Sequence, residues 1–165
     1  MVLISREEAE SFLYLEARLV DERQYDNWLE LFAEDGIYWL PIDTNFGPKE
    51  HLSLIYDDDL RRRERVHRLS LAPPAQTPVS QTLHVVSNVE VNNGIDNYDA
   101  VLTSAQMIYE IRGGDDRQLE LGDPRIFAAR CEHRLRRHNA SWKIVLKRMV
   151  LLNRHVPIPN LTFIM

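Results

Sequence analysis

Apolar residues near the start of the chain recur with the period of a helix. Ser5 followed by Glu8 fits a capping box, in which each side chain binds the backbone N–H of the other residue. The apolar positions then fall on one side of the expected helix: Phe12, Leu15 and Leu19. The pattern predicts an amphipathic helix over residues 5–21.

A second apolar stripe at helical spacing follows closely: Tyr25, Trp28, Leu31 and Phe32. The Asp35-Gly36 pair after it is a stop signal for a helix. The next residues, "IYWLP", predict a short aromatic strand that ends at Pro41. Two helices should therefore lead into one strand, whereas the mixed residues 43–56 predict no element.

The period changes to two residues after a proline-rich linker that contains Pro73, Pro74 and Pro78. In "TLHVVSNVEVN" the odd-numbered residues from Leu83 to Val91 form the apolar face, which puts His84 on the polar face. The alternation returns, again with the apolar side chains at odd numbers, in residues 99–112 and 126–137. A final strand, "WKIVLKRMVLLNRH", follows the turn "RHNAS".

Long strands joined by short turns predict an antiparallel sheet, and the preceding helices should cover its one apolar face. The expected fold class is therefore α+β. A chain of 165 residues with 44% hydrophobic content forms one domain with a sizeable core, so we expect a single domain over residues 1–165. Pro157 and Pro159 predict an extended tail over residues 157–165.

Composition narrows the possible functions. A net charge of -5 argues against nucleic acid, which needs a basic face. No apolar run is long enough for a membrane helix, and the N-terminal residues lack the features of a secretion signal, so a cytoplasmic location is expected. With Cys131 as the one cysteine, neither a four-thiolate site nor a two-Cys, two-His iron-sulfur site can be assembled from this chain.

The segment "DDDLRRRERV", residues 57–66, could be a metal site, a nucleic-acid patch or a polarised helix. Adjacent carboxylates rarely converge on one ion, so no metal site is predicted. The helical interpretation takes Asp57 as N-cap, with the following acids near the positive end of the helix dipole. Arg61, Arg65 and Arg68 then share one helix face, which is either solvated or able to bind carboxylates of a partner.

Other titratable residues allow a competing hypothesis. Asp35, Tyr38, His67 and Tyr109 could form a small dehydratase or isomerase site inside a cone-shaped cavity. The simpler interpretation is that Asp35 caps a helix end and the tyrosines pack. His133 and His138 do not form a pair of metal ligands, because an odd separation along a strand directs them to opposite faces.

An ordered set of motifs carries a family resemblance. The set comprises "YLEARLVDERQYDNWLELFAEDGIYWLP", "RVHRLS", "PP", "QTLHVVSNVEV", "FAARCEHRLRR" and "WKIVLKRMVLLN". In this order the motifs resemble the β (small) subunit of bacterial aromatic-ring-hydroxylating (Rieske non-haem iron) dioxygenases, from about residue 12 to 153. The tail "NLTFIM" also resembles the apolar ending of several such subunits. Family members often have "R-T-R-H" where this chain has Gln81-Thr82-Leu83-His84, so contacts of those arginines do not carry over.

The resemblance implies an NTF2-like cone, in which a curved antiparallel sheet is covered by N-terminal helices. It also implies an α3β3 hexamer whose α subunit holds a Rieske [2Fe-2S] cluster and a mononuclear Fe(II) and dihydroxylates an aromatic compound with O2. This chain would then stabilise the assembly without catalytic residues, metal or cofactor of its own. The residues expected at its interfaces with the α subunit and sister β subunits are Trp39, Arg65, Arg68, His84, Leu161 and Phe163. A stand-alone enzyme that uses Asp35, Tyr38 and His67 is the alternative.

Overall fold

The computed structural model describes residues 3–71, 78–95, 98–112, 123–158 and 161–165. The helices are α1 (Arg6–Asp21), α2 (Tyr25–Leu29) and α3 (Asp59–Ser70). The strands are β1 (Phe32–Pro41), β2 (Ser53–Asp57), β3 (Gln81–Asn93), β4 (Ala100–Ile111), β5 (Arg125–His138) and β6 (Ser141–Leu151). These helices and strands confirm the predicted α+β class. None of the helices in the described ranges is long and apolar enough to cross a membrane.

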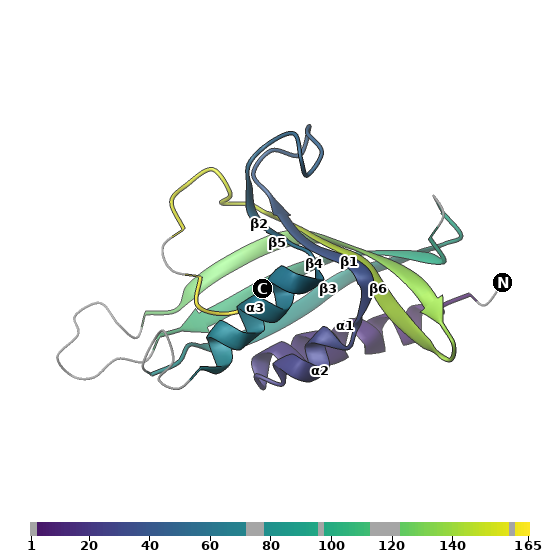
Figure 1. The fold of residues 1–165 in the computed structure, drawn as a ribbon, viewed down its shortest axis with the longest axis horizontal. Coiled ribbons are helices and arrows are strands. Elements are labelled where there is room, and N and C mark those ends of the chain that lie inside the picture. The colour runs from purple at the N-terminus through teal and green to yellow at the C-terminus, as the bar shows by residue number, and fades with distance from the viewer. Residues whose placement is uncertain (1–2, 72–77, 96–97, 113–122, 159–160) are drawn as a thin grey trace.

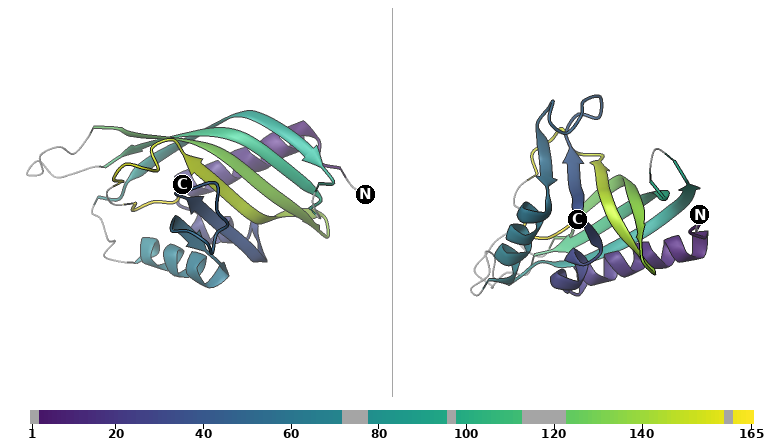
Figure 2. Two further views of the ribbon diagram at one scale, coloured as in Figure 1. Left: turned by 90° about the horizontal axis from the view of Figure 1, so that it is seen from above. Right: turned by 45° about the vertical axis from the view of Figure 1, so that its right-hand side comes forward.

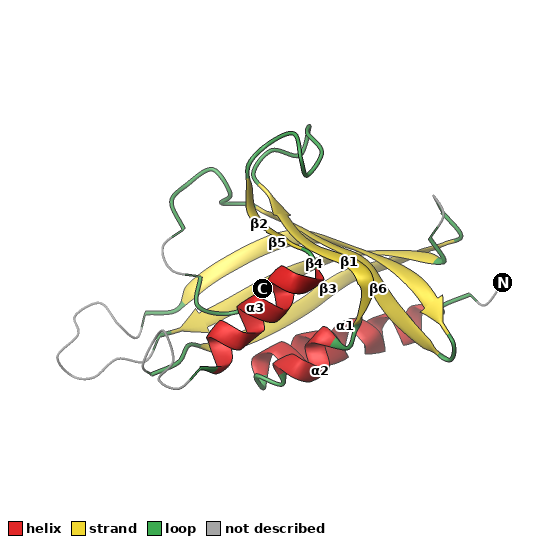
Figure 3. Cartoon of the chain, viewed as in Figure 1, coloured by secondary structure: helices red, strands yellow, loops and turns green. Residues whose placement is uncertain are grey.

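The strands form one six-stranded sheet in the order β2-β1-β6-β5-β4-β3. The sheet is curved, and the three helices lie on the same side of it, as Figures 1 and 3 show. We call this covered side the inner face and the opposite side the outer face. The antiparallel pairing predicted for the long strands is confirmed from β3 to β6, whereas β1 runs parallel to β6 and makes the sheet mixed. This architecture is the NTF2-like fold.

Helix α1 begins as the sequence predicts. The Glu8 backbone N–H donates to Ser5 Oγ at 3.1 Å, and the Ser5 N–H donates to Glu8 Oε2 at 2.8 Å, which completes the capping box. The buried side of α1 packs against β3 and the inner face of the sheet through Leu13, Leu19 and Val20. Two views from other directions show α1 running along the sheet beside its β3 edge (Figure 2).

The second helix is shorter than predicted. Helix α2 ends at Leu29, and strand β1 already begins at Phe32 and continues through Asp35 and Gly36, so the prediction of a helix stop at this pair was wrong. Gly36 instead allows β1 to lie close to β6. A Cβ at Gly36 would lie 2.6 Å from the carbonyl oxygen of Ile144 in β6, closer than real contacts allow.

A β-bulge reverses the predicted face of β3. Asn88 has a φ of 53°, and the pairing with β4 shifts between Ser87 and Glu90. Before the bulge the even-numbered residues point inward, so His84 is buried and Leu83 is 58% exposed; after it, Val89 is buried. The prediction of an odd-numbered buried face was therefore wrong for the start of β3.

The same prediction was wrong for β4, whose buried side chains are at even numbers because they pair in register with the start of β3. It is confirmed for β5, where Phe127, Ala129, Cys131 and Leu135 are buried. Strand β2 lies, except for Asp57, within residues for which the sequence predicted no element, and it pairs antiparallel with β1.

The last described residues fold back onto the inner face. The backbone N–H of Met165 donates to Tyr38 Oη, and Tyr38 Oη donates to the Met165 carbonyl, both at 3.1 Å. The ring of Phe163 packs against Phe127 with 5.7 Å between centroids. Ile164 is also fully buried. The chain therefore fills this end of its own cone with its own apolar side chains.

Replacing Gly36 with alanine tests the close approach of β1 to β6. We expect Gly36→Ala to lower the free energy of unfolding by about 1–3 kcal/mol, because the added methyl group meets rigid backbone oxygens. Gly47→Ala is the matched control, since its Cβ would meet only the flexible Glu50 side chain. Urea denaturation measures both variants. Equal stability of the two would contradict the role given to Gly36.

Candidate functional site

A buried polar cluster joins α1 to the centre of the sheet. Lys147 Nζ of β6 donates to Glu16 Oε1 at 2.7 Å, and His133 Nε2 of β5 lies 2.9 Å from Glu16 Oε2. Trp28 Nε1 adds a hydrogen bond to Oε1 at 3.2 Å. All four residues of this cluster are at most 1% exposed. The Glu16 carboxylate is therefore hydrogen-bonded to protein donors and not to water.

Electrostatics keep this carboxylate ionised. Burial by itself would raise the pKa of Glu16, but the charges and hydrogen bonds of Lys147 and His133 outweigh burial and lower it. Both carboxylate oxygens are occupied by donors from the chain itself. The cluster is therefore arranged to hold a helix on a sheet rather than to accept a proton from a substrate.

The sequence did not reveal this cluster. The sequence suggests His133 only as a neighbour of His138, and the structure separates the two: His133 is fully buried, and His138 is exposed at the end of β5. A signal was present, because Lys147 falls among the apolar residues of the last strand and Glu16 lies on the apolar side of the first helix. Only the fold shows that these positions meet.

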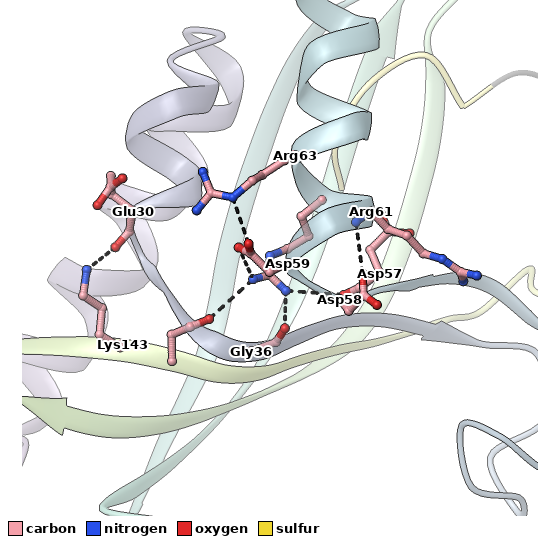
Figure 4. A network of polar contacts seen from close by, with 10 residues as sticks. Glu30, Gly36, Asp57, Asp58, Asp59, Arg61, Arg63 and Lys143 are labelled. Atoms are coloured by element: carbon pink, nitrogen blue, oxygen red, sulfur yellow. Dashed lines mark hydrogen bonds and ion pairs between the residues drawn. The ribbon is translucent and has the colours of Figure 1, made fainter.

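The acidic start of the 57–66 segment caps and anchors helix α3, as Figure 4 shows. Asp58, not Asp57, is the N-cap, because its Oδ1 accepts from the Arg61 backbone N–H at 3.0 Å. Asp57 is the last residue of β2 and pairs with Arg65, whose Nη2 donates to Oδ1 at 3.2 Å. The predicted polarised helix is thus present and begins one residue later.

Arg62 is a buried anchor that the sequence did not single out. Its guanidinium donates to the backbone carbonyls of Gly36, Asp57 and Ala33 and lies 4.4 Å from the centroid of the Phe32 ring. Its neighbour Arg63 is exposed and pairs with Asp59 at 2.9 Å (Figure 4). One arginine of the run therefore fixes α3 to β1, and the next faces solvent.

The six predicted interface residues occupy different environments. Arg68 is exposed, and its Nε donates to the Glu64 carbonyl. Arg65 is bound to its own chain, Leu161 is half-buried, and Phe163 packs in the core. Trp39 is buried on the outer face, where Arg148 stacks on its ring and Ser53 accepts from its Nε1. Their role at an interface stays a prediction.

The sixth of these residues, His84, is held by the end of α1. Asp21 accepts from the His84 backbone N–H at 2.9 Å and lies 2.6 Å from Nδ1, and it also accepts from Thr82 Oγ1. Burial acts to raise the pKa of Asp21, yet its hydrogen bonds with His84 and Thr82 lower it overall. Asp21 thereby occupies the free edge of β3.

The alternative catalytic set is not assembled. Asp35 lies in an exposed ion pair with Arg136 at 2.9 Å, and His67 is exposed on α3. Tyr38 is buried with its hydroxyl bound to Met165, and burial raises its pKa. Each of the three residues lies in its own surroundings, and within the described part of the chain their side chains make no contact with one another.

No metal centre emerges from the residues that the structure describes, in which no three or more His, Cys, Asp or Glu side chains come together as a ligand group. Cys131 is buried on the inner face, and burial raises its pKa to about 12. A thiol with this pKa stays protonated at neutral pH and behaves as a small apolar side chain.

Comparison with known proteins gives one consistent picture. The family model described as "Ring hydroxylating beta subunit" matches residues 15–158. The small oxygenase component of a p-cumate 2,3-dioxygenase system from Pseudomonas putida is 33% identical, over 90% of this chain and 79% of that protein. The β subunit of a benzene 1,2-dioxygenase from P. putida is 30% identical, over 94% of this chain and 86% of that protein.

The fold agrees with that of a solved relative. The crystal structure of the β subunit of a benzoate 1,2-dioxygenase from Burkholderia mallei superposes with a TM-score of 0.76. The alignment covers 99% of this chain and 100% of the other at 23% identity.

The buried cluster predicts a large effect of removing one charge. Lys147→Met should lower the free energy of unfolding by roughly 3–5 kcal/mol, because Glu16 would stay buried without its cation. Arg136→Met, which breaks an exposed ion pair, should change it by less than about 1 kcal/mol. Chemical denaturation compares the two variants, and similar losses would rule out a special role for the cluster.

The lowered pKa of Glu16 also predicts a pH dependence. Its stabilising effect is complete above its ordinary pKa of 4.5 and is lost as the pH falls toward the lower folded value. The free energy of unfolding should therefore fall more steeply in acid for the wild type than for Glu16→Gln/Lys147→Met, which has neither charge. Parallel curves below pH 4.5 would contradict this assignment.

A third prediction separates two neighbouring arginines. Arg62→Leu should lower the free energy of unfolding by about 1–3 kcal/mol, because buried carbonyl oxygens lose their donor. Arg63→Leu removes a similar side chain from an exposed position and should leave the urea midpoint close to that of the wild type. If both variants unfolded at the same urea concentration, Arg62 would not be an anchor.

Proposed function

This chain belongs to the ring-hydroxylating β-subunit family, and we propose that it is the structural β subunit of an aromatic-ring-hydroxylating dioxygenase. The observation that carries this proposal is the family match over residues 15–158, which spans helices and sheet alike. The chain would assemble and stabilise the oxygenase, and an α subunit would carry out the dihydroxylation of an aromatic compound with O2. The chain itself supplies no catalytic residue in this proposal.

The redox groups of the oxygenase are assigned to the α subunit. A Rieske cluster needs two cysteines and two histidines, and this chain has one cysteine, which is buried in its own core. The Rieske [2Fe-2S] cluster and the mononuclear Fe(II) would therefore both belong to the partner. We further propose an α3β3 hexamer in the cytoplasm, with neither nucleic acid nor membrane as a partner.

The state of the buried polar groups supports a structural role. The Glu16 carboxylate is satisfied by side chains of its own chain, and Tyr38 is occupied by the last described residue. We assign the interface to Arg68, which is exposed, and to Arg65 and to Leu161 of the tail, which are half-buried. The buried residues Trp39, His84 and Phe163 would then support this surface from within the chain.

Reconstitution tests the proposed function. An affinity-tagged α subunit, expressed with this chain, should retain it through purification and oxidise an aromatic substrate in the presence of its electron-transfer proteins. Omission of the chain should abolish activity or leave the α subunit aggregated, and adding it back during expression should restore activity. An α subunit that is fully active alone, or a chain that never co-purifies with it, would refute the proposal.

A control variant tests whether the chain itself is catalytic. His67→Ala removes an exposed residue of the alternative site and should leave the activity of the reconstituted oxygenase unchanged. Turnover of a dehydratase or isomerase substrate by the isolated chain, lost in His67→Ala, would instead support the alternative.

A further inference from the structure

Two carboxylates of α1 each hold a histidine on the inner face of the sheet. Glu16 binds His133 of β5, and Asp21, further along the helix, binds His84 of β3. Each histidine uses one ring nitrogen for its carboxylate, which is Nε2 in His133 and Nδ1 in His84. The second nitrogen of each ring is buried and has no hydrogen-bond partner among the described residues. Both rings therefore keep an unpaired polar atom in the interior.

Two side chains of β4 are in the same condition. Ser104 Oγ and Gln106 Oε1 are buried, and neither has a hydrogen-bond partner in the part of the chain that the structure describes. Both residues belong to the even-numbered, inward-facing set of β4. Together with His84 and His133 they are at most 8% exposed. Buried polar atoms in native proteins nearly always have a hydrogen-bond partner, so four exceptions on one face require an explanation.

Strand pairing places these four side chains in one continuous row. Gln106 lies diagonally across the β3–β4 pair from His84, and Ser104 lies diagonally across the β4–β5 pair from His133. Gln106 and Ser104 are successive inward residues of β4. Neighbours of this kind have Cβ atoms roughly 6–8 Å apart, and one water molecule joins polar atoms about 5.6 Å apart, which is twice a hydrogen-bond length. The spacing along the row therefore suits bridging by water.

The chemistry of the unpaired atoms also calls for a bridging molecule. Burial acts to raise the pKa of Glu16 and of Asp21, yet their charged and hydrogen-bonding partners lower both, so each carboxylate accepts the proton of the ring nitrogen that faces it. In a neutral imidazole the second nitrogen is then an acceptor, as Gln106 Oε1 is, and Ser104 adds one hydroxyl proton. Three acceptors and one hydroxyl cannot satisfy one another, and a protonated ring would turn its nitrogen into a donor. The bridging molecule must therefore both donate and accept.

Helix α1 offers the row no such groups. Between Glu16 and Asp21 its buried residues are Ala17, Leu19 and Val20, whose side chains are apolar. These side chains neither donate nor accept hydrogen bonds, although α1 packs on this face of the sheet (Figure 2). The partners of the row must therefore come from a small molecule within the interior.

We propose that buried water molecules bridge this row and join His84 to His133 through Gln106 and Ser104. Water donates and accepts, and buried water in proteins typically makes about three hydrogen bonds to otherwise unpaired polar groups. The resulting relay connects the Asp21–His84 pair with the Glu16–His133 pair. A change at one histidine then reaches the other through hydrogen bonds, and the two attachments of α1 to the sheet act together. The inference concerns the interior of this chain and goes beyond the proposed function.

A high-resolution crystal structure of the full-length wild-type chain tests for the water molecules directly. Ordered water oxygens should lie within about 3.2 Å of all four unpaired atoms and within hydrogen-bonding distance of one another. A row without water, or direct hydrogen bonds among the four side chains, would overturn the inference. This measurement needs no substitution, so it decides the question even where a variant fails to fold.

The chemical shifts of the ring nitrogens test whether the water molecules form a relay. His84→Asn keeps a side-chain N–H for Asp21 but removes the second ring nitrogen, so it should shift the nitrogen resonance of His133 Nδ1. In a Gln106→Met background, which interrupts the row, His84→Asn should leave that resonance unchanged. A shift of equal size in both backgrounds, or no shift in the wild-type background, would refute the relay.

Gln81→Met is the matched control for the interruption. Gln81 is exposed at the start of β3, so the same chemical change is made outside the row. In this background His84→Asn should still shift the His133 resonance as it does in the wild type. Loss of the shift here as well would contradict the place given to Gln106 in the relay. Circular dichroism checks that each variant is folded.

Discussion

The buried Glu16 carboxylate is the constraint on which the rest of the structure depends. An ionised carboxylate inside a protein is very unfavourable unless donors surround it, and its donors come from α2, β5 and β6. These elements are far apart in the chain, so the cluster is satisfied only when the helix pair and the sheet have met in one arrangement. Asp21, at the end of the same helix, adds a second attachment at the edge strand β3. Helix α1 is thus fixed to the middle and to the edge of the sheet together.

A second set of contacts closes the other side of the cone. Arg62 ties α3 to the carbonyls of β1, and Gly36 lets β1 approach β6 in parallel pairing. The last residues then complete the inner face by packing beside Phe127 and binding Tyr38. These contacts use the inner side chains and the backbone around them, so this end of the cone is filled by the chain itself.

The sequence predicted the elements whose signals are local. The Ser5–Glu8 capping box predicted the start of α1, and the strict alternation of β5 predicted its buried face. The inner face of β3 was mispredicted because the bulge at Asn88, a single residue of positive φ, exchanges the two faces and has no clear signature in the pattern. The Glu16 cluster could not be predicted, since Glu16 is more than a hundred residues from His133 and Lys147 in the chain and only the tertiary fold brings them together. Of the candidate interface residues, the sequence identified Trp39 and the arginine helix, but it placed Met107 on the buried face of its strand, whereas this side chain is 41% exposed.

That misassignment has a physical meaning. Apolar residues at alternate positions of a strand normally mark the buried face, and Leu83, Val85 and Met107 satisfy that pattern as well as the residues of β5 do. They are exposed because the bulge and the register of β4 give the inner face to their neighbours, among them His84 and Ile108. Both faces of β3 and β4 therefore carry apolar side chains, so the alternation in the sequence does not by itself distinguish the buried face from the exposed one.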